Sequence, residues 1–395
     1  MLINGRQACI VGVGLSDDFG FDLGKSALRL QIEAFDHALS DAGMQRHDVD
    51  GFETAHGSPG GVDYEEFTVA MGLRVRFVDQ AWAHGRWATG LVAHAAFAVT
   101  TGLADVVAIC NTRTTRRGYM RHVAGLGGAP TREGQRDVGG GHGEWVVHGT
   151  DTPGSSTALV AQRYMEKYGA TSADLARICV GFRQNAQLNP IAILKGKPLT
   201  EEQYNNEPII AGPFRRSDYS LLNEGSTCLL VTTTDRARDL RTAPSIVAGV
   251  QGLRSSRDDY VMFSRPGLGV GFASEFDYVA EPQPVYDMAG VNQDDIDALY
   301  VYDAFSSNLW MILERFGFCR PGEAPGFVEQ SGVGLASDMP INTNGGLMAE
   351  GELFGYAHIV EMVRQLRGDA GQRQVMNAEA MQWATPWGDS LILTK

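Results

Sequence analysis

Residues 88–102 limit the fold of this chain more than any other stretch. They carry no charged side chain and place small or apolar residues on nearly every face of a helix. A helix that is apolar all round has to be buried on all sides, so we expect it at the centre of the molecule. The chain continues into residues 103–110, an apolar run typical of a parallel strand covered on both faces. A central helix joined to such a strand indicates a layered α/β architecture.

Strand and helix signals alternate on both sides of this central pair. In the first half we expect a strand, a helix ending at Gly43 and a second strand, at residues 10–14, 25–43 and 51–55. The second half repeats the alternation, with strands at 246–250, 298–302 and 390–393 and helices at about 285–298, 305–317 and 351–367. This pattern predicts a duplicated α/β fold; a chance echo of short apolar runs is the alternative.

The predicted division of the chain follows from this repeat. The N-terminal half covers residues 1–240 and the C-terminal half residues 241–395. Within the first half, residues of about 111–165 are basic, then rich in glycine, and poor in apolar periodicity. Such a stretch is typical of an inserted loop region at the surface.

Charge and cysteine content exclude several classes of protein. The chain has 395 residues, 47 acidic and 33 basic, with a net charge of −14. A general nucleic-acid binder needs a broad basic face instead. No apolar run approaches the ~20 residues of a membrane span, and residues 1–14 are too short and too interrupted by glycine for a signal peptide. The five cysteines are odd in number and far apart, so we expect reduced, buried thiols in a cytoplasmic protein.

Five stretches point together to one family. They are CIVGVG at 9–14, the segments 158–200 and 213–240, Tyr302-Asp303-Ala304-Phe305, and NTNGGLMAEGELFGYAHIVE at 342–361. In their order and spacing they resemble the thiolase superfamily, in its branch of sterol-carrier-protein thiolases and bacterial lipid-transfer proteins. The resemblance covers nearly the whole chain. It implies the five-layered α/β/α/β/α thiolase fold with two related βαβα halves.

The catalytic cysteine of that family is missing. Thiolases hold it at the N-terminus of the buried central helix, where the helix dipole favours the thiolate. The matching position here is Gly85, beside His84, and no cysteine occurs between Cys9 and Cys110. A glycine cannot carry an acyl group, so the sequence excludes an ordinary thiolase.

The other catalytic positions have changed as well. Tyr302 stands in place of the oxyanion-hole histidine or asparagine, and Glu352 in place of the histidine of Gly-His-Pro. The second cysteine, an acid/base in thiolases, is absent from residues 382–388. A phenol and a carboxylate suit proton transfer without a covalent intermediate. Loss of activity in an inactive scaffold would more often leave alanine, serine or glycine at such positions.

The resemblance extends to the cysteine-less aldolases of this branch, which shorten steroid side chains. It implies a retro-aldolase that cleaves the Cα–Cβ bond of a branched, steroidal 3-hydroxyacyl-CoA to a ketone and a short acyl-CoA such as propionyl-CoA. Those aldolases use tyrosines at the positions of Tyr302 and Glu352. Tyr302 is therefore expected to be an acid/base or enolate donor. Glu352, a departure from the family, either replaces a phenol as base or marks a different substrate.

Further residues are expected to bind the substrate. His84, Gly85, Asn344 and Gly345 match positions around the family's site, and His358 lies six residues beyond Glu352 on the same predicted helix. The alternative for each histidine is a hydrogen-bonded core residue. Within the basic run Arg113, Arg116, Arg117 and Arg121, we expect Arg116 and Arg117 to contact CoA phosphates. A solvated or subunit-interface face is the alternative for that run.

Cofactors and partners follow from the resemblance. HGEWVVH at 142–148 lacks the HExxH spacing and no paired cysteine motif occurs, so we expect no metal and no cofactor on this chain. The family implies a homodimer and an acyl-CoA-binding partner with an OB-fold and a zinc ribbon, which would hold any zinc. Two alternatives stay open: a thiolase-like acyltransferase or condensing enzyme with another nucleophile, and a non-catalytic lipid or acyl-CoA carrier.

Overall fold

The computed structural model describes residues 2–3, 5–56, 61–82, 88–114, 153–254 and 283–395. Their centre is a ten-stranded sheet in the order β10-β11-β12-β9-β2-β8-β5-β3-β4, with β1 paired to β2. The strands are β1 (Leu2–Ile3), β2 (Arg6–Leu15), β3 (Gly51–His56), β4 (Phe77–Trp82), β5 (Val107–Arg113), β8 (Gly225–Thr233), β9 (Ser245–Gln251), β10 (Ala298–Val301), β11 (Ala380–Ala384) and β12 (Ser390–Thr394). A separate hairpin joins β6 (Ile209–Ala211) and β7 (Phe214–Arg215).

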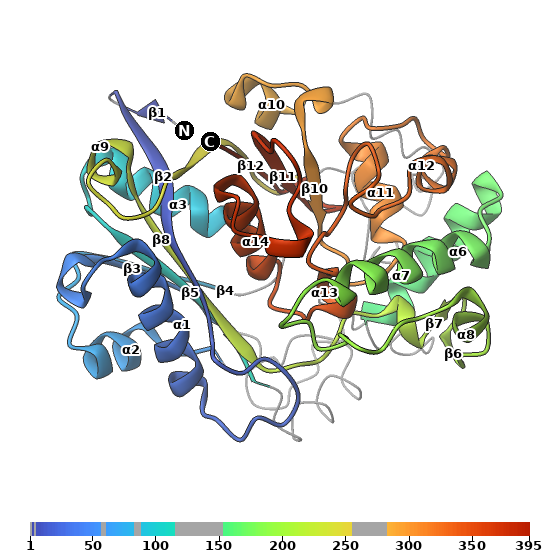
Figure 1. The fold of residues 1–395 in the computed structure, drawn as a ribbon, viewed down its shortest axis with the longest axis horizontal. Coiled ribbons are helices and arrows are strands. Elements are labelled where there is room, and N and C mark those ends of the chain that lie inside the picture. The colour runs from blue at the N-terminus through green and yellow to red at the C-terminus, as the bar shows by residue number, and fades with distance from the viewer. Residues whose placement is uncertain (1, 4, 57–60, 83–87, 115–152, 255–282) are drawn as a thin grey trace, which may run out of the picture.

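Helices cover both faces of this sheet (Figure 1). They are α1 (Ala27–Ala42), α2 (Tyr64–Met71), α3 (Ala88–Thr101), α6 (Pro153–Tyr168), α7 (Ser172–Gln187), α8 (Glu201–Asn205), α9 (Thr234–Ala237), α10 (Pro284–Ala289), α11 (Asn308–Arg315), α12 (Ala324–Ser331), α13 (Gly346–Ala349) and α14 (Tyr356–Arg367).

The layers follow the five-layered order expected from the sequence. The sheet has two halves, one formed by β1–β5 and β8 and the other by β9–β12. They meet at a short pairing of β2 with β9, in which Cys9 faces Ile246 and Ile10 faces Ser245. Both α3 and α14 contact strands of the two half-sheets, so they form the middle layer. Helix α1 packs on the outer face of β2, β8 and β5, and α10 on β9 and β12 (Figure 1). The thiolase-type α/β fold is confirmed, and the boundary between residues 240 and 241 stays a prediction.

Strand β2 shows why this sheet is covered on both faces. Cys9 and Val11 pack into the outer cluster with α1, whereas Ile10 joins the inner core that contains α3. Two glycines let α1 approach closely. A Cβ at Gly12 would lie 2.5 Å from the Ala38 carbonyl oxygen, and one at Gly14 would lie 2.1 Å from that of Ala34. Part of the glycine content therefore serves the packing of helix on strand.

Most predicted elements are confirmed, and four expectations need correction. Helix α3 is not buried on all sides, because the Phe97 residue is 47% exposed and the His94 side chain 57% exposed. The helix expected over 285–298 ends at Ala289, where Gly290 adopts a left-handed conformation with φ 71°. The loop region expected over about 111–165 is shorter, since β5 runs to Arg113 and α6 begins at Pro153.

The fourth correction concerns the segment that carries Glu352. The predicted helix over 351–367 is shorter at its start, because α14 begins only at Tyr356. Gly351, Phe354 and Gly355 have φ of 152°, 54° and 85°, which no right-handed helix accommodates. Glu352 therefore lies in a loop between α13 and α14, and His358 lies in α14. The two residues do not share a helix.

The cysteines agree with the expectation of free thiols. Four are buried and Cys319 is half-buried, and none forms a disulfide. Within the described part of the chain, no helix is both long enough and apolar enough to cross a bilayer.

Candidate active site

Tyr302 follows the last residue of β10 and is 4% exposed. Its backbone N–H donates to the Ala384 carbonyl at the end of β11 (3.0 Å), and its carbonyl accepts from the Asn308 side chain at the start of α11 (3.0 Å). Its ring packs edge-on against Trp383, with centroids 6.2 Å apart, and against Trp387 at 5.6 Å. A buried phenol thus packs on two indoles, one at the end of β11 and one in the β11–β12 turn.

Asp303, the next residue, ties this strand end to the glycine turn at 344–346. It is fully buried and accepts hydrogen bonds from the backbone N–H groups of Leu347 (2.9 Å) and Met348 (3.2 Å). A carboxylate at the start of a helix satisfies amides that have no partner within the helix. Gly346 has φ 72°, and a Cβ there would lie 2.1 Å from Asp303 Oδ2. Two sequence motifs therefore meet directly, and the contact requires glycine.

Asn344 and Gly345 shape this turn. The Asn344 amide donates to the Glu350 carboxylate, which also accepts from the Asn189 amide at 2.8 Å. Gly345 has φ 106°, and a Cβ there would lie 2.6 Å from Ala186 of α7. Burial, together with the charge of Glu361, raises the pKa of Glu350 to about 8. The contacts of Asn344 and Gly345 are those of a buried turn, and their expected role in substrate binding stays a prediction.

Glu352 has an arginine partner that the sequence did not indicate. It forms an ion pair with Arg113 at the end of β5, and the two side chains are 4% and 5% exposed. Its Oε1 accepts from the Phe354 backbone N–H at 2.6 Å, and the Arg113 guanidinium lies 5.1 Å from the centre of the Phe354 ring. The backbone N–H of Glu352 donates a hydrogen bond to Asn223 Oδ1 at 2.6 Å. An adjacent arginine stabilises the ionised carboxylate.

Arg113 corrects the interpretation of the basic run. The sequence pattern places it in one basic stretch with Arg116, Arg117 and Arg121, but Arg113 is 4% exposed and belongs to a buried strand. The available signal was its place at the end of an apolar run, which predicts a strand terminus instead of a solvated loop. Arg116 and Arg117 lie outside the described residues, as do His84 and Gly85.

His358 and Tyr302 both pack against the Trp383 indole. His358 is fully buried in α14, with its ring centroid 5.2 Å from that of Trp383. Its Nε2 is 3.4 Å from Asp303 Oδ1, although neither ring nitrogen makes a hydrogen bond. Gly355 packs on the same indole, where a Cβ would lie 2.3 Å from the Trp383 ring. Trp383 thus brings Tyr302, His358 and the end of the Glu352 loop together.

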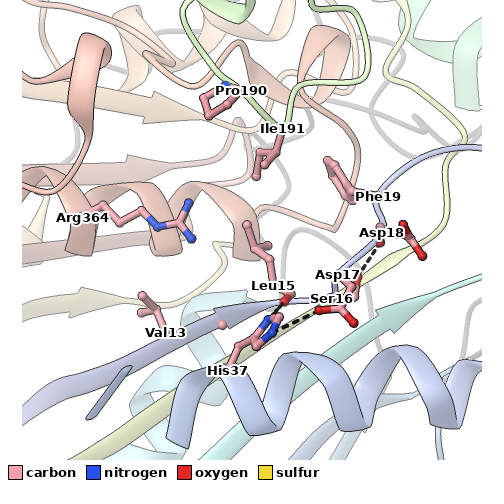
Figure 2. Close-up of a pocket in the computed structure, with 11 residues that line it drawn as sticks. Val13, Leu15, Ser16, Asp17, Asp18, Phe19, His37, Pro190, Ile191 and Arg364 are labelled. Atoms are coloured by element: carbon pink, nitrogen blue, oxygen red, sulfur yellow. Dashed lines mark hydrogen bonds and ion pairs between the residues drawn. The ribbon is translucent and has the colours of Figure 1, made fainter. Parts of the chain in front are cut away.

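A separate cavity of about 610 Å³ lies between the end of β2 with the segment after it, α1 and α14 (Figure 2). Figure 2 shows Arg364 of α14 and His37 of α1 reaching into it, below Pro190 and Ile191. His37 pairs with Asp17 at 3.1 Å. Phe19 lines the cavity and also packs on Gly351, where a Cβ would lie 2.3 Å from its ring. Neither Tyr302 nor Glu352 lines this cavity.

Metal ligands do not gather in the described ranges, where no group of three or more histidine, cysteine, aspartate or glutamate side chains is suited to hold an ion. The site consists instead of a phenol, an ion pair and two tryptophans. A phenol and a carboxylate can donate and accept protons. The sequence indicated Tyr302 and Glu352, whose catalytic roles stay a prediction. It did not indicate that Trp383 and Trp387 contact Tyr302 or that Arg113 pairs with Glu352.

Comparison with known proteins agrees with this geometry. Residues 280–385 match the family model described as thiolase C-terminal domain-like. A Mycobacterium tuberculosis protein, 17-hydroxy-3-oxo-4-pregnene-20-carboxyl-CoA lyase, is 36% identical over 368 residues, covering 92% of each chain. A steroid side-chain-cleaving aldolase from Thermomonospora curvata is 34% identical over 91% of this chain and 90% of the relative.

Solved structures agree as well. The structure of an Ltp2-ChsH2(DUF35) aldolase aligns with a TM-score of 0.83 at 29% identity, over 98% of this chain and 97% of that one. Human mitochondrial 3-ketoacyl-CoA thiolase in complex with CoA aligns over 99% of this chain and 98% of that one, with a TM-score of 0.64 at 14% identity, which supports the fold alone. The chain belongs to the thiolase superfamily, in the group that contains these steroid side-chain lyases and aldolases.

Proposed function

We propose that this chain is a retro-aldolase that cleaves the Cα–Cβ bond of a branched, steroidal 3-hydroxyacyl-CoA, releasing a ketone and a short acyl-CoA such as propionyl-CoA. The observation that carries the proposal is the 36% identity, over 92% of both chains, to a lyase named for a steroid carboxyl-CoA. Tyr302 supports it, because this buried phenol replaces the polar group of a thiolase oxyanion hole.

The reaction needs a proton acceptor and a donor, and the electrons balance without an oxidant. A base takes the proton of the 3-hydroxyl group while its oxygen forms the ketone C=O bond. The Cα–Cβ electron pair moves into the thioester as an enolate, which a hydrogen-bond donor stabilises and a proton then quenches at Cα. We assign the donor role to Tyr302. No redox cofactor or metal is required of this chain, and the substrate brings its own CoA.

Glu352 fits the acceptor role because of Arg113. A buried carboxylic acid without a cation would stay protonated, whereas the ion pair with Arg113 stabilises the carboxylate that can accept a proton. A tyrosine at this position, as in the aldolases of the branch, would have no need of that arginine. The Glu352 carboxylate, paired with Arg113, can therefore take the place of the tyrosine that the other aldolases of the branch have at this position.

The assembly is part of the proposal. The structural relative is named as a complex with a DUF35 protein, and we propose that this chain also works with a DUF35-type acyl-CoA-binding partner, which would hold any zinc. A homodimer of this chain and a cytoplasmic location, where acyl-CoA thioesters occur, complete the proposal.

The test is an assay of the chain co-purified with its DUF35-type partner on a panel of steroidal 3-hydroxyacyl-CoAs, with ketone release followed by mass spectrometry. Tyr302→Phe should lower kcat by at least ~10²-fold without a change in thermal unfolding. Tyr64→Phe, on α2 and away from the two tryptophans, serves as the control. Wild-type kcat in Tyr302→Phe would show that the tyrosine assignment is wrong.

The same assay separates the alternatives. Covalent labelling of the chain by acyl-CoA would favour an acyltransferase or condensing enzyme. Tight binding of every acyl-CoA without any product would favour a lipid or acyl-CoA carrier.

A further inference from the structure

The cavity between the end of β2, α1 and α14 lies where the two halves of the sheet diverge. The register of β2 with β9 covers Cys9 and Ile10, whereas β2 continues to Leu15. Val13, Gly14 and Leu15 line the cavity on this stretch beyond the pairing, and its volume is about 610 Å³. A cavity of this size is in the range that holds a small molecule.

One part of the cavity wall is apolar. Val13 and Leu15 lie on its β2 side and Phe19 follows them, while Pro190 and Ile191 lie across the cavity (Figure 2). Ile191 is 37% exposed. A ligand that covers such apolar surface gains free energy by removing it from water. This part of the wall therefore favours a ligand with an apolar body.

The acidic residues of the cavity already have cationic partners. Asp17 lies 3.1 Å from His37 Nε2, and Asp18 lies 2.6 Å from Lys25 Nζ. His37 Nδ1 lies 2.7 Å from the Leu15 carbonyl oxygen, so both ring nitrogens of this histidine have partners. These pairs balance the acidic end of the cavity.

Arg364 is not balanced in this way. Its half-buried side chain reaches into the cavity from α14 (Figure 2), and within the described ranges its guanidinium forms no hydrogen bond or ion pair. Burial and the charge of Glu361 raise the pKa of Glu350 to about 8, although Arg364 lowers it in part. Glu350 is therefore mostly protonated at neutral pH and does not neutralise Arg364.

The chemistry of the missing counter-charge follows from this arrangement. A half-buried guanidinium has lost part of its hydration, so an anion that reaches it gains a charge-assisted hydrogen bond, and the planar fork of arginine matches a carboxylate. A polyanion such as a diphosphate would find one free cation and would also meet the charges of Asp17 and Asp18. The lining therefore favours a single negative charge.

We propose that this cavity binds a monocarboxylate with an apolar body, with the carboxylate on Arg364 and the body against Leu15 and Phe19. The site goes beyond the proposed aldol cleavage and does not depend on it, because neither Tyr302 nor Glu352 lines the cavity. A steroidal acid and a fatty acid share this chemistry, and the test distinguishes the two sources.

The test is isothermal titration calorimetry of the full chain with two acids, deoxycholate and decanoate, each below its micelle concentration, and with their neutral methyl esters. We expect at least one acid to bind at least ~10-fold more tightly than its ester. Arg364→Met should weaken that acid at least ~10-fold and leave the affinity of the ester unchanged. Arg320→Met, at a side chain that is 84% exposed in the turn before α12, is the control and should change neither affinity.

A second pair of variants tests the site without removing the arginine. Ile191→Glu adds a negative charge at the rim, and Ile191→Gln is the neutral control of nearly the same shape. Because Ile191 is partly exposed, both variants should fold like the wild type. We expect the glutamate variant to bind the acid more weakly than the glutamine variant, with equal affinities for the ester.

The outcomes decide both the site and the source of its ligand. Binding that depends on Arg364 supports the site, and the acid that binds more tightly identifies the ligand as steroidal or as a fatty acid. Equal affinities for acid and ester, or no binding of either acid, would overturn the proposal. So would an acid that competes with substrate in the ketone-release assay and binds Arg364→Met as tightly as the wild type, since that acid would occupy the catalytic site. A chain that binds the acid through Arg364 but releases no ketone would overturn the proposed function alone.

Discussion

Replacing Arg113 by methionine tests the buried ion pair that distinguishes this site. The substitution keeps much of the volume of the side chain but leaves the Glu352 carboxylate without its cation. Both side chains are about 5% exposed or less, so solvent cannot take the place of the guanidinium. The carboxylate would keep one backbone hydrogen bond, from Phe354 at 2.6 Å. Breaking a buried pair by removing one partner costs about 3–5 kcal/mol in the free energy of unfolding.

The Arg113 guanidinium also lies 5.1 Å from the centre of the Phe354 ring, a contact worth about 1–2 kcal/mol when desolvated. We therefore expect Arg113→Met to lower the free energy of unfolding by about 4 kcal/mol at pH 7. The loss should shrink at acidic pH, because protonation removes the unpaired charge. Glu352→Gln alone should also be destabilising, since it leaves a buried guanidinium without a counter-charge.

A double-mutant cycle gives the decisive measurement. The double variant Arg113→Met, Glu352→Gln should be more stable than the sum of the two single losses predicts, by at least ~2 kcal/mol. Urea unfolding followed by tryptophan fluorescence measures all four proteins. The exposed pair of Arg46 and Asp36, at 3.0 Å, provides the control, and Arg46→Met should cost less than ~1 kcal/mol. If Arg113→Met lowered the free energy of unfolding no more than Arg46→Met does, the buried ion pair would not stabilise the protein as argued.

Two further predictions concern stability. Gly346→Ala should lower the free energy of unfolding by roughly 2–4 kcal/mol, because φ is 72° and the new Cβ would lie 2.1 Å from Asp303 Oδ2. Gly326→Ala in α12 is the control, since its Cβ would meet nothing within 4 Å. Equal losses of stability in the two variants would contradict this prediction. Since burial raises the folded pKa of Asp389 to about 8 from an ordinary 3.8, the folded state holds a proton that the unfolded state releases. Asp389 should therefore contribute a fall in stability of up to ~1.4 kcal/mol per pH unit between pH 4 and 8. Asp389→Asn should make the pH dependence shallower by that amount in urea unfolding at pH 5 and 8, and parallel pH dependences of the two proteins would rule this out.

Local patterns predicted much of the architecture. The apolar run at 103–110 indicated a buried strand, and β5 is buried along its whole length. Gly43 was expected to end the first helix, and it does so in a left-handed conformation with φ 72°. These signals depend on neighbours in sequence, so they are readable without the fold.

Other features depend on residues that are distant in sequence. Asn111 near the end of β5 hydrogen-bonds the carbonyl of Leu353, 242 residues away, and the same approach sets Arg113 against Glu352. A periodic pattern cannot reveal such a neighbour. The predicted helix over 351–367 failed for a related reason: packing on Phe19 and Trp383 holds Gly351 and Gly355 in conformations outside the helical range. Helix α3 likewise has an exposed side that its uncharged composition concealed.

The sequence by itself determined that this chain has a layered α/β fold of the thiolase type and no cysteine where a thiolase needs its nucleophile. It also indicated Tyr302 and Glu352 at two of the changed catalytic positions, and their catalytic roles stay a prediction. The tertiary structure decided what those residues face: two indoles around Tyr302, an arginine beside Glu352, and a buried acid, Asp389, in the turn next to them. The reason is physical. A residue's type follows from the sequence, but its ionisation and its reach depend on burial and on the charges that folding brings near it.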